Sequence, residues 1–286
     1  MSGLCRVART GYTAVLMQFF QYREDRLPVL LMLGLSAINF AIYWWVRDPR
    51  LLVLWTLVGI IPKGWTCAWN HHHQHVMTFR QPILNRLLEI PYCFLTGITS
   101  HGWVLHHVVG HHRNYMNQDL DESRWRHKDG RVMTEAYYTF HNTLWAYPRC
   151  LAVGLRRPKY LPVFLGMGAL NLTLLALAFA HAPLAALLVY AIPMLVSLTL
   201  TVQATYDHHA GLFSTDPMTA SYNVMDRWYN LATLNLGYHT AHHYRPIVHW
   251  SRLPELHAKI APQIPKELYR PPGAPFSWIY AARRFL

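Results

Sequence analysis

Long uncharged blocks of apolar residues dominate the chain. Residues 27–46 contain no charged side chain, and about 20 apolar residues are needed to cross the hydrocarbon core of a bilayer as a helix. A second block, residues 51–70, is interrupted only by Lys63. These two blocks predict a helical hairpin, with spans near 27–46 and 51–69 and a turn at the intervening sequence RDPR.

The longest uncharged run covers residues 160–206. Its 47 residues are too many for one span and suit two, with a turn at the sequence HAP. Pro183 can begin the fourth helix, because proline at the first helical position removes no intrahelical hydrogen bond. Pro193 is expected to kink that helix. We therefore predict a second hairpin, with spans near 160–181 and 183–205.

The pattern predicts an all-α integral membrane protein that forms one domain, residues 1–286. Four spans arranged as two hairpins return the intervening segments to the same side of the membrane. A histidine-rich helical cap is therefore expected from residues 70–158 and 206–265. The remaining residues, 266–286, form a tail that is expected to rest against the membrane surface.

Basic residues gather before the first and third predicted spans, as in Arg23, Arg26 and Arg156. Because short cytoplasmic loops carry an excess of Lys and Arg, the cap is predicted to face the cytoplasm from an inner, cytoplasmic membrane. Residues 83–105 are apolar but contain Arg86, Glu89 and Pro91. That segment favours a helix lying in the membrane interface over a fifth crossing.

Composition supports this class of protein. Charged residues make up 14% of the chain, against roughly 25% in soluble domains. The net charge is +12, but the basic residues flank apolar blocks and no nucleic-acid-binding module is visible. Lipid headgroups and an acidic protein partner are the expected partners, and nucleic acid is not. The four cysteines lack CxxC spacing and are expected to be reduced packing residues.

Histidine is the unusual residue of this chain, with 19 copies. They gather in four segments: NHHHQH (70–75), HHVVGHHRNYMN (106–117), DHHAGL (207–212) and NLGYHTAHHYRP (235–246). Residues i and i+4 share one face of a helix, as do residues i and i+3. Neutral imidazole is the commonest transition-metal ligand, so four such segments on one side of a membrane predict a metal site.

Eight histidines have the spacing that metal ligands on helices require: His71, His75, His107, His111, His112, His239, His242 and His243. Eight imidazoles are too many for one ion and suit two, since a metal takes about four to six ligands. His112 lies about 100° around a helix from His111 and could therefore serve a second metal. Isolated histidines are expected to be packing residues: His101, His127, His141, His181, His249 and His257.

These segments resemble the histidine boxes of the membrane fatty acid desaturase and hydroxylase superfamily. The boxes HxxxH, Hxx(x)HH and HxxHH are similar to His71–His75, His107–His112 and His239–His243, and the sequence LPELH after the last box is also typical. The resemblance covers roughly residues 30–260. It implies two iron ions, held by the eight histidines together with one more beyond the last span. His209 best matches that ligand, with His208 as the alternative.

Other polar residues near the boxes are candidates for orienting the imidazoles, although turn or capping roles explain them equally well. They are Asn235, Asp119, Asp121 and Asp226. His72 and His73 depart from the simple HxxxH box and are expected to support the ligands or to lie on the helix surface.

The resemblance implies an O2-dependent oxidoreductase acting on a fatty acyl or alkyl chain, with a desaturase as the first hypothesis. A hydroxylase, another monooxygenase or an oxidative decarboxylase would use the same metal ligands. Electrons must come from outside, from a ferredoxin or similar carrier with its reductase, because the chain has no flavin, haem or iron–sulfur motif. A histidine-rich metal transporter is the alternative from another class, but it should carry ionisable ligands near the middle of its spans.

Overall fold

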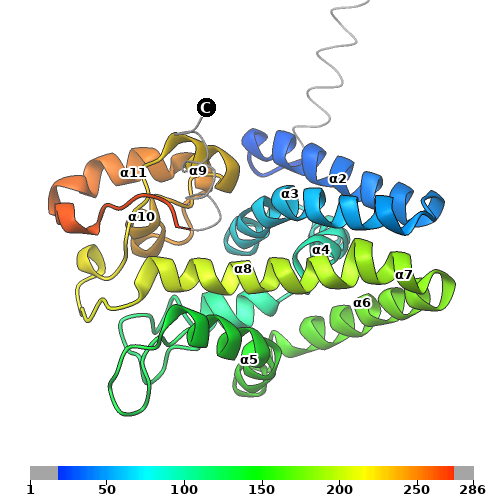
Figure 1. The fold of residues 1–286 in the computed structure, drawn as a ribbon. Coiled ribbons are helices and arrows are strands. Elements are labelled where there is room, and N and C mark those ends of the chain that lie inside the picture. Colours follow the sequence, from blue (N-terminus) through cyan, green and yellow to red (C-terminus); the bar gives the residue numbers. More distant parts are fainter. Residues whose placement is uncertain (1–18, 274–286) are drawn as a thin grey trace, which may run out of the picture.

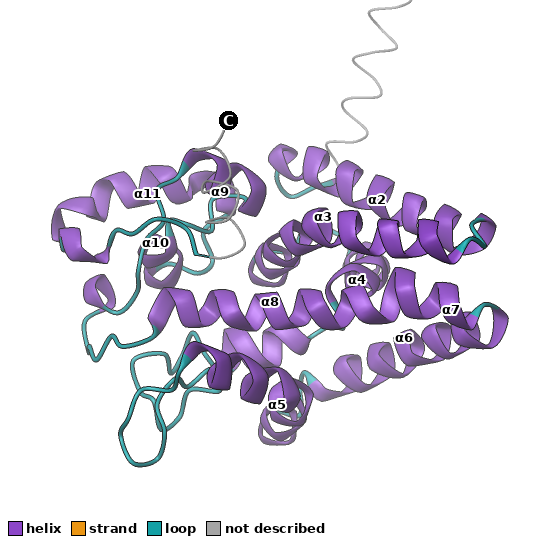
Figure 2. Cartoon of the chain, viewed as in Figure 1, coloured by secondary structure: helices purple, strands orange, loops and turns teal. Residues whose placement is uncertain are grey.

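The computed structural model describes residues 19–273, and these are entirely helical apart from loops and three isolated bridges. Figure 2 shows helices and loops without strands. Four stretches are long and apolar enough to cross a membrane, so the chain is an integral, multi-pass membrane protein. They are Arg23–Trp45, Pro49–His75, Leu161–His181 and Pro183–His209. The predicted fold class is confirmed, and each predicted span overlaps one of these four candidate spans.

The helices with their bounds are α2 (Arg26–Trp45), α3 (Pro49–His75), α4 (Pro82–Thr96), α5 (Glu135–Arg156), α6 (Leu161–His181), α7 (Pro183–Ala185), α8 (Ile192–His209), α9 (Arg227–Thr233), α10 (His239–Tyr244) and α11 (Leu253–Ile260). Two π-helices, η2 (Val104–Val109) and η3 (Ala186–Ala191), join them. Short 3-10 turns are η1 (Arg23–Asp25), η4 (Pro217–Thr219), η5 (Trp250–Arg252), η6 (Ala261–Gln263) and η7 (Lys266–Leu268).

The two hairpins lie side by side, with both of their turns at one end of the molecule (Figure 1). Helices α9, α10 and α11 gather at the opposite end. Helices α3 and α8 continue past the predicted ends of their spans to His75 and His209, because no proline or glycine interrupts the final turns. The first histidine segment and residues 207–209 of the third therefore occupy the last turns of spanning helices.

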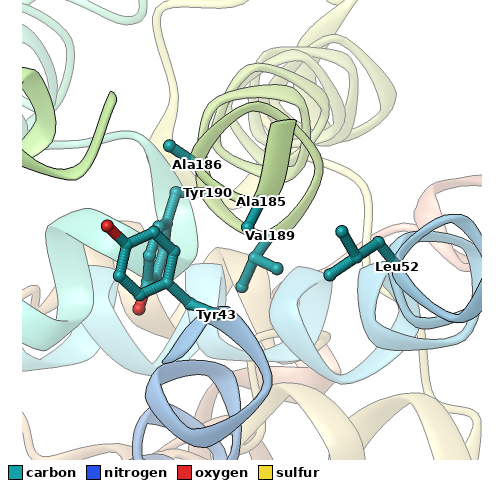
Figure 3. Close-up of a cluster of buried hydrophobic side chains, with 6 residues drawn as sticks. All are labelled: Tyr43, Leu52, Ala185, Ala186, Val189 and Tyr190. Atoms are coloured by element: carbon teal, nitrogen blue, oxygen red, sulfur yellow. The ribbon is translucent and has the colours of Figure 1, made fainter. Parts of the chain in front are cut away.

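Apolar side chains pack the hairpins together near their turns. Figure 3 shows one such cluster, formed by Tyr43 of α2, Leu52 of α3 and residues of α7 and η3. The faces of α2 and α6 that point away from this core expose large apolar side chains such as Leu30 and Leu172. Such surfaces suit lipid contact, since lipid tails are as apolar as leucine.

Pro193 shapes the fourth span through the π-helix η3, which ends two residues before it. Proline has no N–H, so the turn that contains the Leu188 and Val189 carbonyls lacks one backbone donor. Two side chains of α3 replace it: Thr56 donates to the Leu188 carbonyl at 2.7 Å, and Lys63 donates to the Val189 carbonyl at 2.9 Å. Lys63, the only lysine of the second apolar block, therefore links α3 to η3 through a hydrogen bond.

Helix α4 has 15 residues and is not among the four stretches that are long and apolar enough to cross a membrane. It packs against α2, α3, α6 and α8, and it is seen nearly end-on between them in Figure 1. Gly97 ends it with φ at 71°, and a Cβ at this position would lie 2.4 Å from the carbonyl oxygen of Met194. This close approach to α8 requires glycine.

Three of the cysteines, Cys67, Cys93 and Cys150, are free and buried, as predicted for packing residues. Cys5 and most of the predicted tail lie outside the described residues.

Candidate metal centre

Five histidines from four parts of the chain form a first cluster. Its members are His71, His75, His107, His112 and His242, and their ligand nitrogens all lie within 4.8 Å of one another. The Nε2 atom of His107 is 2.9 Å from that of His71 and 3.0 Å from that of His112. His242 Nε2 in turn is 3.0 Å from His112 Nε2. The end of α3, helix η2, the turn after η2 and α10 thus converge on one point.

A second cluster contains His111, His209 and His243, whose ligand nitrogens also lie within 4.8 Å of one another. The Nε2 atom of His209 is 3.2 Å from that of His111 and 3.1 Å from that of His243. His239 adjoins this cluster, with its Nε2 atom 3.0 Å from that of His209. The consecutive residues His111 and His112 therefore point into different clusters.

The spacing of these nitrogens fits metal ions. A transition-metal–imidazole bond is about 2.1 Å long, so two ligands at a right angle on one ion have nitrogens about 3.0 Å apart. The nearest Nε2 pairs in both clusters lie at 2.9 to 3.2 Å. Without a metal, two facing ring nitrogens can form only one hydrogen bond between them. A bound metal ion would instead coordinate the lone pair of each nitrogen in the cluster.

Burial favours the neutral, metal-binding form of five of these imidazoles. It lowers the pKa of five of them well below the usual value, because the charged form would lose its hydration; they are His107, His112, His239, His242 and His243. Neighbouring imidazoles add to this effect. The lowered pKa values favour the neutral form of these five imidazoles, which is the form that binds metals.

Hydrogen bonds from the far ring nitrogens orient two members of the second cluster. His111 Nδ1 lies 2.9 and 3.0 Å from the two carboxylate oxygens of Asp121, which is fully buried. His209 Nδ1 lies 3.0 Å from the carbonyl oxygen of Ala220. A proton held on Nδ1 leaves the Nε2 lone pair free for a metal. Asp121 thus occupies the position that the sequence interpretation suggested for it.

The other three polar candidates take local roles. Asp119 is exposed and pairs with Arg126 at 3.1 Å. Asp226 begins α9, where its carboxylate accepts a hydrogen bond from the backbone N–H of Tyr229 at 2.8 Å. Asn235 has φ at 65° and donates to the carbonyl of Trp250. These contacts match the turn and capping interpretation, because short polar side chains satisfy nearby backbone groups.

The remaining box histidines lie beside the clusters. His208 Nε2 is 3.1 Å from the Tyr229 hydroxyl, so His209, and not His208, projects into the second cluster. His73 lies 2.9 Å from Thr78 Oγ1 and 3.3 Å from a Glu89 oxygen. His72 and His73 are both buried, so the alternative that they lie on the exposed helix surface is wrong.

The isolated histidines have varied surroundings away from the clusters. His101 hydrogen-bonds the Tyr160 carbonyl, His249 the Asp25 carboxylate and His257 the Tyr269 hydroxyl. The rings of His127 and His141 pack against Tyr137. The ring of His181 packs against Trp44.

Two aromatic residues border the clusters, and the sequence interpretation did not include them. Trp103 stacks on His71 with ring centroids 5.1 Å apart, and Tyr115 lies 4.3 Å from His243 by the same measure. Their spacing carried a signal: Trp103 precedes His107 by four residues, and Tyr115 follows His111 by four. Such pairs lie on one face of a helical segment.

A cavity of about 660 Å³ between α3 and α8 reaches the clusters. His71, His107 and His239 line it at the cap end, and Ile60, Ile61, Val196 and Leu200 line it farther along the spans. Its walls are mostly apolar, with Asp207 and Arg270 as charged exceptions. The arrangement can bring an apolar chain from the level of the spans to the candidate metal ligands.

Residues 49–272 match the family model described as fatty acid desaturase. The matched range includes both histidine clusters and three of the four spans. No curated protein matches the chain.

Proposed function

The chain belongs to the fatty acid desaturase family of oxidoreductases, and we propose that it is an O2-dependent di-iron oxidase that desaturates a fatty acyl or alkyl chain. The observation that carries this proposal is the pair of adjoining histidine clusters at the end of an apolar cavity. We assign nine ligands, five in the first cluster and four, counting His239, in the second.

Iron would supply what side chains cannot. Two bound irons, with O2, can oxidise the unactivated C–H bonds of an alkyl chain. The chain's own residues supply binding and orientation. Asp121 would hold the proton of His111 on Nδ1, and the Ala220 carbonyl would do the same for His209. Seven of the nine assigned ligands are buried, which limits their contact with water.

The cavity is suited to an alkyl substrate. An apolar chain lying against Ile60, Gly64 and Leu200 would pass from the level of the lipid to His71. Ile61 is 53% exposed and also lines the cavity, so the cavity borders the lipid-facing surface of α3. We infer that the substrate enters laterally from the membrane, where long-chain lipids are concentrated.

Electrons for the reaction would come from a soluble carrier, such as an acidic ferredoxin with its reductase. The net charge of +12 favours encounter with an acidic partner. We place the histidine-bearing face in the cytoplasm, where such carriers are found. Full turnover of the reconstituted protein without any external reductant would contradict this part of the proposal.

Lipid profiling by mass spectrometry of a host that expresses the chain tests the reaction. A lipid that has lost two hydrogens supports desaturation. A lipid that has gained one oxygen would show hydroxylation, and a shortened hydrocarbon would show decarboxylation; both use the same ligands and either would replace the desaturase assignment. A host that expresses the His111→Ala variant gives the background.

Metal analysis of the purified protein tests the di-iron assignment and the transporter alternative together. Two irons per chain without zinc supports the oxidase. A single, weakly held zinc would contradict it. The candidate ligands lie on the final turns of the spanning helices and in the cap, not along the middle of the spans where a transport site is expected.

A further inference from the structure

Arg270 lines the cavity that reaches the histidine clusters, and its side chain is 34% exposed. Its Nη2 atom is buried and has no hydrogen-bond partner among the described residues. The nearest acid is Asp207, whose Oδ1 atom lies 3.9 Å from Nη2. This distance is beyond hydrogen-bonding range. Asp207 therefore balances the charge of Arg270 without satisfying its N–H groups.

The position of Arg270 is held from two sides. Its guanidinium stacks over the ring of Tyr222 at 4.0 Å, which fixes the plane and leaves the N–H edges free. Its backbone N–H donates to the Asn223 carbonyl at 3.0 Å. The Asn223 side chain in turn bonds Thr240 of α10, the helix that carries His239 and His242. Arg270 is thus tied to the same helix as the candidate ligands.

A guanidinium whose Nη2 donor is buried and unpaired at one end of an apolar cavity is suited to bind an anion. Burying an unpaired donor costs free energy, and a guanidinium binds a planar carboxylate through two parallel hydrogen bonds. We propose that Arg270 binds the carboxylate of a long-chain fatty acid whose alkyl tail fills the cavity. This inference rests on the proposed function, because it assumes that the cavity takes an alkyl chain.

The anchor lies at the cap end of the cavity. Asp207 precedes His208, and the His208 ring stacks on that of His239 at 3.9 Å. From His71 the cavity continues along α3 to Ile60, a helical rise of about 16 Å. A carboxylate at Arg270 therefore places the tail toward the lipid and the first carbons beside the clusters. The oxidised position should be close to the carboxyl end.

Binding of radiolabelled palmitate to the purified, metal-loaded protein without oxygen tests the anchor, because no turnover occurs. Methyl palmitate serves as the uncharged probe. We expect Arg270→Gln to weaken palmitate binding about tenfold or more and to leave methyl palmitate binding unchanged, since one charge-assisted pair is lost. Arg270→Lys keeps the charge and should retain part of the affinity. Arg252→Gln, an exposed arginine outside the cavity, is the matched control.

The inference is overturned if Arg270→Gln binds palmitate like the wild type, or if both probes lose affinity equally. The Asp207→Asn variant should have the opposite effect, because it removes the carboxylate that competes with palmitate for Arg270. We expect it to bind palmitate more tightly. Unchanged palmitate affinity would instead indicate that Arg270 and Asp207 form a purely structural pair. These results are separate from the proposed function. If Arg270→Gln binds palmitate like the wild type and still yields oxidised lipid, only the role of Arg270 as a carboxylate anchor is rejected. If the wild-type protein yields no oxidised lipid, the proposed oxidase function is rejected.

Discussion

The imidazole rings of His112 and His243 stack nearly parallel, with centroids 4.0 Å apart and an interplanar angle of 15°. His112 belongs to the first cluster and His243 to the second. The two clusters are therefore in direct contact through these two stacked rings. Two metals bound there would be neighbours, which an oxidation that uses both requires.

Loss of one ligand from either cluster should remove iron and activity together. We expect His242→Ala, in the first cluster, and His111→Ala, in the second, each to abolish product formation and to lower bound iron. Membrane insertion should stay intact, because neither residue lies in a span. Iron analysis of the membrane-extracted variants is the measurement. Wild-type turnover in either variant would rule out that ligand.

Asp121 should matter for metal affinity although it is not itself assigned as a ligand. Asp121→Asn removes the carboxylate that holds His111 in one orientation. Loss of such a partner typically lowers metal affinity about 10- to 100-fold, and we expect the same range in an iron titration. Asp119→Asn is the matched control, since Asp119 is exposed and pairs only with Arg126 among the contacts described for its side chain. Equal affinities in both variants would contradict the role of Asp121.

The adjacent residues His208 and His209 should differ sharply. His209 lies in the second cluster. The two ring nitrogens of His208 instead lie near the Tyr222 carbonyl oxygen and the Tyr229 hydroxyl. We expect His209→Gln to lose iron and activity, and His208→Gln to retain most of its iron. Iron content of the two variants, normalised to folded protein, checks this expectation. The reverse order would move the ninth ligand to His208.

The hydrogen bonds from α3 to the π-helix η3 should contribute to stability without affecting the metal site. Thr56→Val keeps the side-chain shape but leaves the Leu188 carbonyl without its donor from α3. We expect a loss of about 1 kcal/mol in stability, measured as a lower thermal midpoint in detergent, with iron content unchanged. Thr199→Val is the control, because Thr199 bonds only a carbonyl of its own helix, one turn earlier. Equal midpoints for the two variants would show that the tie is dispensable.

Local spacing was enough to predict much of this protein. The lengths of the uncharged blocks determined four spans, because a helix needs a certain number of apolar residues to cross a bilayer. Helical periodicity indicated which residues share a face, so His71 with His75 and His239 with His243 could be paired from sequence alone. The family resemblance then pointed to His209 as a ligand. The match to the fatty acid desaturase family model confirms the family that the resemblance suggested.

Contacts between distant segments could not be obtained in this way. Local periodicity already suggested that His111 and His112 serve different metals, and they do lie in different clusters. Nothing in the local pattern, however, brings Trp103 onto His71 or leaves the Arg270 guanidinium beside Asp207. Periodicity describes one helix at a time, whereas these contacts depend on how two hairpins pack and on where the cap returns across them. The sequence alone determined the spans and the candidate ligands; only the tertiary structure decided how the ligands divide into two clusters and what lines the cavity that reaches them.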